Sequence, residues 1–424
     1  MEPGRPLIAE DSPYLGWPGR PKLRVGNFLS LTFYWFSNNV LWTGLLMIVM
    51  PAKVMQLVGA SASTTHLSLV DLVGTIVAVL AAPTFGAISD RWQTRSGRRR
   101  PQMALGVIGN IVFFLIMGFA GNFPMFLIGF VGVQLFNNVA GSAYQGLIPD
   151  LVAHEQRGTA SGFMGTWNNL GVIVGAGLAF ALAGMGYWYA TAFLLLLGLA
   201  VTLLFVREPH PPAAKPFHLG AFLRGFLIGG PDYRDFWWVY LTRFIVMLGL
   251  YVLEFYLSYY LQFVMGIKHP AGAIFVVLVI LTVAALLTGL SGGYLSDRLG
   301  KRKFLVTWAG ILMGLASLLF VFMHSMVEIY VAAALFGFGY GAYMATDYAL
   351  VVDTLPTKNA AKDMGIWGTS TTLPQTLASM IGLALAALVI PHWGYSVGYR
   401  SLFAITFVLF LIGSVLVRKV RKVA

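Results

Sequence analysis

Four charged residues stand inside long apolar runs of this sequence: Asp71, Arg243, Glu254 and Asp347. A charge at the centre of a lipid-exposed helix costs about 2.5–3.5 kcal/mol, so each of these side chains is expected to face protein or water. Arg243 and Glu254 are eleven residues apart. On a helix this spacing places them on one face, roughly 16 Å from each other.

Buried groups of these types can exchange protons or bind a polar solute. Glu254 and Asp347 are candidates for the proton-exchanging or solute-binding acid, and Arg243 for a solute ligand or counter-ion. The alternative is a structural ion pair, and pairing of Arg243 with Asp347 would neutralise both charges. Asp71 is a further candidate for proton coupling or a counter-ion; the alternative is that it lies near the outer end of its helix and only faces water.

Amide and aromatic side chains recur at middle depth in several apolar runs. Amides bond hydroxyl groups and aromatic rings pack on C–H faces, so the combination suits a neutral polyhydroxylated ligand. The alternative is ordinary helix–helix packing. The residues expected to line such a cavity are Trp35, Asn38, Trp42, Gln134, Asn138, Tyr144, Asn169, Tyr251, Trp367 and Gln375.

The composition indicates which secondary-structure elements carry these residues. The chain is 58% hydrophobic and 10% charged, with a mean hydropathy of +0.77, whereas a soluble domain carries about 25% charged residues. A spanning helix needs roughly 20 apolar residues. The sequence predicts an all-α membrane protein with twelve transmembrane helices at 28–50, 65–89, 101–120, 123–149, 159–183, 186–206, 236–264, 271–295, 303–323, 327–352, 364–390 and 397–417.

The net charge of +12 is unevenly placed. If twelve spans alternate, the basic clusters fall on one side, which the positive-inside rule assigns to the cytoplasm together with both termini. The expected location is therefore the plasma membrane, with anionic lipid headgroups as partners of these charges and no nucleic acid. The absence of cysteine excludes disulfides and thiolate chemistry. No metal site is expected.

Two internal repeats indicate two six-helix halves. Asp90-Arg91, with Arg98 following, recurs as Asp297-Arg298 at an offset of 207 residues, and Asp150 recurs as Asp353 at an offset of 203. The expected organisation is an N-terminal tail (1–26), a six-helix bundle (27–206), a cytoplasmic linker (207–235), a second bundle (236–417) and a basic tail (418–424).

The segment from Asp90 to Pro101 resembles the signature loop of the major facilitator superfamily. This resemblance implies the major facilitator fold, with two pseudo-symmetric bundles that move against each other around a central site. It also implies that charges at helix ends link in one state and part in the other; the alternative is that they only set topology. The residues concerned are Asp90, Arg91, Arg98, Asp150, Arg157, Asp297, Arg298 and Asp353.

Within the superfamily, Arg95 to Pro101, the pair Asn137-Asn138 and Leu373-Pro374-Gln375 look like the glycoside–pentoside–hexuronide and sucrose-type symporters. Two departures matter. Val79 and Ala82 stand where melibiose-type members place sodium-coupling aspartates, and Gln134 stands where sucrose-type members place a proton-binding aspartate. Sodium coupling at that site is not expected, and proton coupling would need another acid.

The resulting expectation is an alternating-access transporter of a small hydrophilic solute, a sugar or glycoside, working as a monomer and not an enzyme. It would have no cofactor other than protons as a coupling ion. Export of amphipathic compounds is the alternative within transport, and a non-transporting membrane sensor is the alternative outside it. Fold resemblance alone does not fix the solute.

Overall fold

The computed structural model describes residues 23–89, 94, 97, 99–152, 156–182, 184–206, 208, 233–299, 302–354 and 360–421. Side chains at 83, 87, 149, 157, 158, 161, 290–299, 348, 349, 352, 353 and 360–366 lie outside this description. The described chain is helical apart from its turns and an isolated bridge between Thr94 and Gly97.

The first half begins with a broken helix composed of α1 (Val25–Thr32), α2 (Tyr34–Gly44), the π-helical turn η1 (Leu45–Val49) and α3 (Met50–Val58). It continues with α4 (Ala60–Ser89), α5 (Arg99–Phe119), α6 (Phe123–Leu151), α7 (Arg157–Ala181) and α8 (Gly186–Phe205). The second half contains α10 (Arg234–Phe263), α11 (Ala271–Leu299), α12 (Arg302–Phe322), α13 (Met326–Thr354), α14 (Ala360–Ala384), the π-helical turn η4 (Leu385–Val389) and α15 (Ile390–Leu416), followed by the short η5 (Val417–Lys419).

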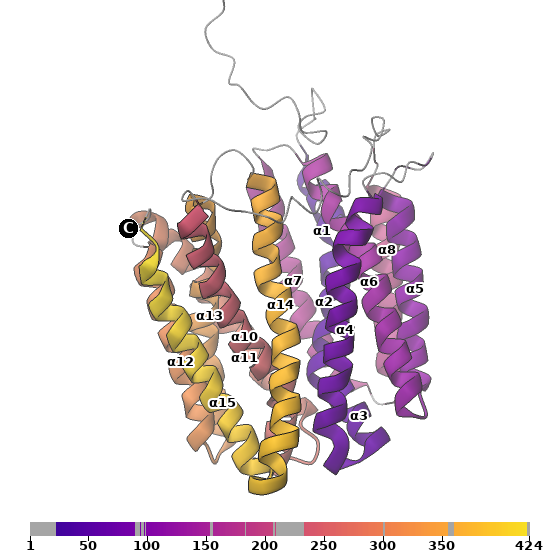
Figure 1. Ribbon diagram of the computed structural model, residues 1–424. Coiled ribbons are helices and arrows are strands. Elements are labelled where there is room, and N and C mark those ends of the chain that lie inside the picture. Colours follow the sequence, from indigo (N-terminus) through magenta and orange to yellow (C-terminus); the bar gives the residue numbers. More distant parts are fainter. Residues whose placement is uncertain are drawn as a thin grey trace, which may run out of the picture.

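Ten described segments are long and apolar enough to cross a membrane. One of them, Trp367–Lys419, spans most of α14 and all of α15, and α7 is a further long helix outside the ten. The described chain therefore forms twelve long helical segments in two six-helix bundles (Figure 1). The predicted all-α membrane fold is confirmed.

Three predicted helix boundaries were wrong. The first helix was expected to end at residue 50, before Pro51, yet it continues to Val58. Proline lacks the N–H that an α-helical turn needs, and the wider π turn at Leu45–Val49 absorbs this defect. The second helix begins at Ala60 rather than 65, and the last begins at Ile390 rather than 397, with a kink at Gly394.

The two bundles share two ends, called the terminal end and the distal end. The terminal end carries the beginning of α1, the end of α8, the beginning of α10 and the end of α15. The distal end carries the turns at Gly59, Gly121, Gly184, Gly266 and Gly394. At Gly59 and Gly266 φ is +78° and +71°, a left-handed backbone that favours glycine.

The two halves meet at the distal end. Hydroxyl groups join Thr64 to Tyr399 (2.6 Å) and Ser68 to Tyr256 (2.7 Å), and the Tyr395 hydroxyl donates to the backbone oxygen of Ala60 (3.0 Å). Phe180 of α7 and Phe275 of α11 stack with ring centroids 5.9 Å apart. Every hydrogen bond between described residues of opposite halves lies in this distal layer.

Within a half, glycine allows very close helix crossings. A Cβ atom placed on Gly106 of α5 would lie 2.3 Å from the backbone nitrogen of Ala140 in α6. Gly162 of α7, in contrast, has nothing within 4 Å of such an atom. The α5–α6 contact is thus made by backbone against backbone, as small residues permit in membrane helices.

Candidate functional site

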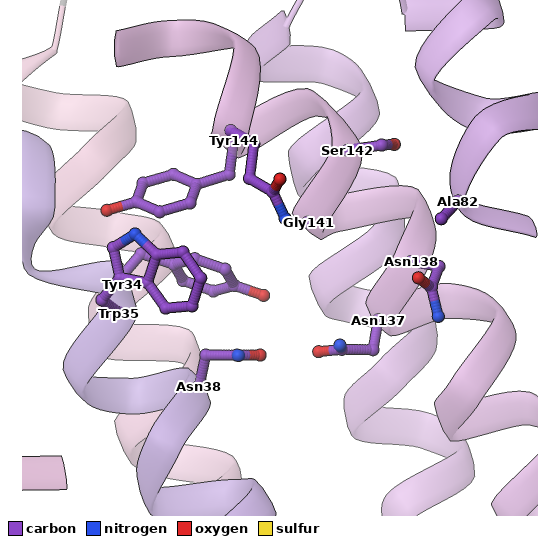
Figure 2. A pocket seen from close by; sticks show the side chains of 10 residues that line it. Tyr34, Trp35, Asn38, Ala82, Asn137, Asn138, Gly141, Ser142 and Tyr144 are labelled. Carbon is purple, nitrogen blue, oxygen red and sulfur yellow. The ribbon is translucent and has the colours of Figure 1, made fainter. Parts of the chain in front are cut away.

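A cavity of about 150 Å³ lies in the first half, between α2, α4 and α6. It carries aromatic rings and amides but no charged side chain (Figure 2). Its lining residues are Tyr34, Trp35, Asn38, Ala82, Asn137, Asn138, Gly141, Ser142, Tyr144 and Gln145. Four residues expected from the sequence to bind solute therefore share one cavity: Trp35, Asn38, Asn138 and Tyr144.

The aromatic wall is held rigidly by ring contacts and one backbone bond. Tyr144 meets Tyr34 edge-on, with centroids 4.9 Å apart, and Trp35 at 6.1 Å. The Tyr144 hydroxyl donates to the backbone oxygen of Leu31 at 2.8 Å. The Tyr34 hydroxyl and the Trp35 indole N–H are buried without a partner among the described residues. Buried polar groups are normally hydrogen-bonded, so these two can serve a ligand.

The amide wall faces the aromatic one. Figure 2 shows Asn38 of α2 and Asn137 of α6 pointing toward each other. Asn137 is fixed because its side-chain oxygen accepts from Asn110 at 3.2 Å, and Asn138 donates to the backbone oxygen of Gln134 at 2.8 Å. Asn39, beside Asn38, packs its Cβ against Gly171 of α7 and donates to the backbone oxygen of Trp35 in its own helix at 2.8 Å.

The other residues expected to bind solute lie outside this cavity. Trp42 meets Phe130 edge-on at 6.3 Å, and Gln134 packs against Gly74 of α4. Asn169 donates to its own helix at Gly165. Tyr251 and Gln375 are half-buried on α10 and α14. Helix packing accounts for Gln134 and Asn169, and the binding role of all five stays a prediction.

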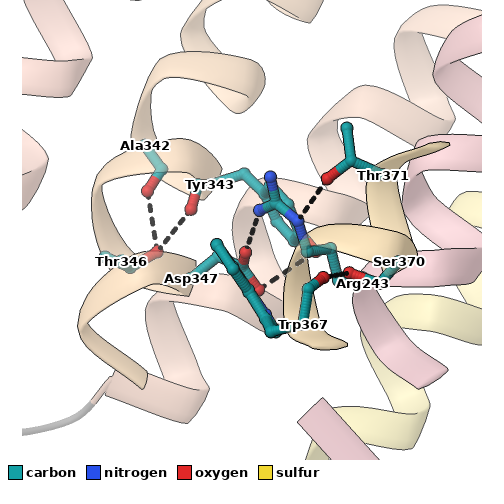
Figure 3. Close-up of polar contacts among 8 residues, drawn as sticks. All are labelled: Arg243, Ala342, Tyr343, Thr346, Asp347, Trp367, Ser370 and Thr371. Carbon is teal, nitrogen blue, oxygen red and sulfur yellow. Dashed lines mark hydrogen bonds and ion pairs between the residues drawn. The ribbon is translucent and has the colours of Figure 1, made fainter. Parts of the chain in front are cut away.

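In the second half, Arg243 and Asp347 form a buried ion pair between α10 and α13 (Figure 3). The Arg243 Nε donates to Thr371 of α14 at 3.1 Å, and its guanidinium lies 4.1 Å from the centroid of the Trp367 ring. The Tyr343 hydroxyl donates to Asp347 at 3.3 Å. The predicted pairing is confirmed. Trp367, expected to bind solute, lies against this pair, and its binding role stays a prediction.

Asp71 is not at a water-facing helix end, as expected, but inside the protein. It lies on the fourth turn of α4, is 2% exposed, and its Oδ2 has no partner among the described residues. The physical reason is the earlier start of α4 at Ala60, which moves Asp71 into the bundle. Glu254 of α10 is half-buried and lies close enough to Asp71 for their charges to interact. The described residues contain no group of three possible metal ligands.

At the terminal end, contacts of Arg99 and Glu208 hold the beginning of α5 against α6 and the end of α8. Arg99 pairs with Asp150 of α6 at 3.1 Å. The Glu208 carboxylate, just beyond α8, accepts from the backbone N–H groups of Arg99 and Arg100 at 3.0–3.1 Å. A helix N-terminus presents such unpaired N–H groups and favours a carboxylate. Glu208 was missed from the sequence because it stands at the edge of the polar linker, 109 residues from its partner.

Glu208 gives a first prediction. Burial raises the pKa of its carboxyl group, and the two backbone N–H donors oppose this rise. A raised pKa means that the folded state holds the proton more tightly. The contribution of Glu208 to stability is therefore largest below its ordinary pKa of about 4.3 and falls as pH rises through the raised value. Relative to Glu208→Gln, the wild-type protein should lose stability as the pH rises from about 4 through the raised pKa.

The measurement is the melting temperature of both proteins in detergent across this range. Other titrating groups are shared, so they cancel in the difference. A difference that stays constant with pH, or that grows in favour of the wild type as pH rises, contradicts the prediction.

The remaining charges predicted to act as gates cannot be placed. Asp90, Arg91 and Arg98 lie outside the described residues, and so do the side chains of Arg157, Asp297, Arg298 and Asp353. Asp150, which is described, pairs within its own half. The gating role of this set stays a prediction.

Comparison with known proteins decides the family. The model of the Major Facilitator Superfamily matches residues 27–379 and, in a second match, residues 274–423. The chain belongs to the major facilitator superfamily. It is thus a membrane transporter of this family, in agreement with its twelve helices.

Individual relatives are more distant. The "Multidrug resistance protein MdtG" of Citrobacter koseri is 25% identical over 370 residues, 85% of this chain and 87% of that protein. The protein of the same name from Enterobacter lignolyticus is 24% identical and covers 84% of this chain and 82% of its own. These names do not support the sugar-symporter branch that the motifs suggested.

Solved structures agree on the fold. A bacterial homologue of the human lysosomal transporter Spinster, in an inward-facing and unoccupied conformation, has a TM-score of 0.67 at 17% identity, covering 94% of this chain and 97% of that one. A POT family transporter in complex with 5-aminolevulinic acid has a TM-score of 0.71 at 14% identity, covering 93% and 96%.

Proposed function

We propose that this transporter exports amphipathic organic compounds, with protons as the coupling ion and the terminal end in the cytoplasm. The observation that carries the proposal is the cavity between α2, α4 and α6. It combines the rings of Tyr34, Trp35 and Tyr144 with amides and contains no charged side chain. Such a site accepts a molecule with an apolar body and a few hydrogen-bonding groups.

Two further observations support export. The relatives quoted above are named multidrug resistance protein, and each is similar to this chain over most of its length. Drug-sized ligands fill pockets of about 300–1,000 Å³, so a cavity of about 150 Å³ would hold one end of such a compound. The rest would extend between the halves, whose hydrogen bonds between described residues all lie in the distal layer.

In this proposal the residue that exchanges the coupling proton is Glu254 rather than Asp347. The charge of Asp347 is compensated by Arg243 and by the Tyr343 hydroxyl. Glu254 makes no hydrogen bond or ion pair with a described residue and remains half-buried.

A second candidate is a sugar or glycoside transporter. The unpartnered Tyr34 hydroxyl and Trp35 N–H favour it, because they are donors suited to a polyhydroxylated ligand. The same cavity would serve drug export and sugar transport, so the class of compound that binds distinguishes the two functions.

Ligand-dependent thermal stabilisation of the purified protein gives the test and a second prediction. A ligand that binds the folded state at 100 times its Kd stabilises it by about 2.7 kcal/mol. We expect amphipathic cations and neutral drugs to raise the melting temperature and saccharides to leave it unchanged. Asn138→Ala should abolish the rise. Asn168→Ala, an exposed position outside the cavity, is the matched control and should preserve it.

Stabilisation by saccharides alone, lost in Asn138→Ala, would replace the export proposal with the sugar candidate. Transport itself is then measured in proteoliposomes with the stabilising compound, by its movement against an imposed pH gradient.

A further inference from the structure

The cavity between α2, α4 and α6 contains a buried hydroxyl group that no described residue bonds. Tyr34 of α2 is 2% exposed, and its hydroxyl has no hydrogen-bond partner among the described residues. Its ring is held edge-on against Tyr144 with centroids 4.9 Å apart, and Figure 2 shows the hydroxyl pointing into the space between α2 and α6. A hydroxyl without an acceptor still carries its hydrogen, so α2 presents a free donor to a ligand.

The opposite wall, formed by α6, presents a free acceptor. The side-chain nitrogen of Asn138 donates to the backbone oxygen of Gln134 at 2.8 Å. A backbone oxygen only accepts, so this bond identifies which end of the Asn138 amide is the nitrogen. The side-chain oxygen of Asn138, which lines the cavity, receives no hydrogen bond from a described residue.

The other polar groups that line the cavity are uncharged. Asn38 and Asn137 point toward each other across it (Figure 2), and Asn137 is bonded to Asn110 at 3.2 Å. Moving an isolated charge from water into such a site costs far more than moving a neutral amide or hydroxyl group. The part of a compound that enters this cavity is therefore neutral, whatever charge the part outside carries.

A donor on one wall and an acceptor on the other are best matched by a secondary carboxamide. Its carbonyl oxygen accepts and its N–H donates, and in the trans form the two point in opposite directions. An ester or ether only accepts, so it would leave the Asn138 oxygen unpaired, which is unfavourable in a buried site. An alcohol donates and accepts from one atom, whereas the two protein groups lie on different walls.

We propose that the cavity binds a secondary carboxamide of the exported compound, with its carbonyl oxygen on the Tyr34 hydroxyl and its N–H on the Asn138 oxygen. The apolar body of the compound lies against the rings of Trp35 and Tyr144 and continues out of the cavity. This inference rests on the proposed function, because it takes the ligand to be an amphipathic organic compound. It adds which polar group such a compound carries.

Two compounds of the same shape test the assignment. The N-methylamide and the methyl ester of naphthylacetic acid share an apolar body and a carbonyl group, and the N–H of the first is an oxygen in the second. The apparent Kd of each follows from the rise in melting temperature of the purified protein with compound concentration. Each compound is compared between wild type and variant, so its partition into detergent cancels.

Asn138→Ala should weaken binding of the amide about tenfold, because one hydrogen bond is lost. It should leave the ester unchanged or bound more tightly, because the ester has no N–H to donate. Tyr34→Phe should weaken both compounds, since both carbonyl groups accept from the Tyr34 hydroxyl. If Asn138→Ala does not fold, this second variant carries the test.

The melting temperature without any compound separates binding from a structural role. Tyr34→Phe should melt no lower than the wild type, because it removes a buried group that has no partner in the empty protein. A hydroxyl that only supported the fold would lower the melting temperature when removed. Tyr189→Phe, at an exposed position on α8 of the same half, is the matched control and should leave all values unchanged.

Equal losses of amide and ester binding in Asn138→Ala overturn the carboxamide assignment, and so does unchanged binding of both compounds in Tyr34→Phe. In either case the compounds still bind, so the export proposal stands. If neither compound binds while saccharides stabilise the protein, the export proposal itself is overturned, and this inference with it.

Discussion

Replacing Arg243 with alanine is expected to lower the free energy of unfolding by about 3–5 kcal/mol. The variant leaves the Asp347 carboxylate fully buried without its cation, and it also removes the bond to Thr371 and the contact with the Trp367 ring. Three helices of the second half, α10, α13 and α14, lose their common contact. The measurement is the melting temperature of the detergent-solubilised variant, together with its yield.

Two variants test the physical reason. Arg243→Met combined with Asp347→Leu removes both charges, so it should recover most of the lost stability. Arg234→Ala, an exposed arginine on the first turn of the same helix, should change stability by no more than about 0.5 kcal/mol. A double variant as unstable as Arg243→Ala would mean that packing, not the stranded charge, dominates the loss.

Gly106→Leu should destabilise the first half at or above the upper end of the about 1–3 kcal/mol typical of overpacking. The new Cβ would meet backbone atoms of Ala140, at 2.3 Å from N and 2.7 Å from Cα, and these cannot rotate away as a side chain would. Helices α5 and α6 would have to separate. The melting temperature in detergent measures this effect.

The matched variant Gly162→Leu is expected to raise the free energy of unfolding rather than lower it. Nothing lies within 4 Å of a Cβ at this position in α7, and leucine is favoured over glycine in a helix by roughly 0.8 kcal/mol. Equal destabilisation in both variants would show that side-chain bulk, rather than the close crossing, is responsible.

The fold was predictable because twelve helices follow from the length and spacing of apolar runs alone. The boundaries at Pro51 and near Gly394 were not, since a π turn before proline and a kinked continuation leave no hydropathy signal. The ion pair was also predictable. Buried charges of opposite sign need partners, and Arg243 and Asp347 had few alternatives.

The candidate cavity was predictable only in part. Trp35, Asn38, Asn138 and Tyr144 gather there, while Gln134 and Asn169, of the same chemical types, face neighbouring helices. Helical spacing tells which residues share a face but not which face meets the other half. The error at Asp71 came from the same source, because five residues at the start of α4 decide whether its carboxyl meets water or protein.

The distal contact between the halves is made of hydroxyls, backbone oxygens and aromatic rings, with no salt bridge among the described residues. When such neutral bonds are exchanged for bonds to water, each changes the free energy by only about 0.5–1.5 kcal/mol. Added salt screens charges but leaves these bonds intact. The stability of this distal contact should therefore be nearly independent of ionic strength, so the closed distal layer would hold alike in dilute and in saline surroundings.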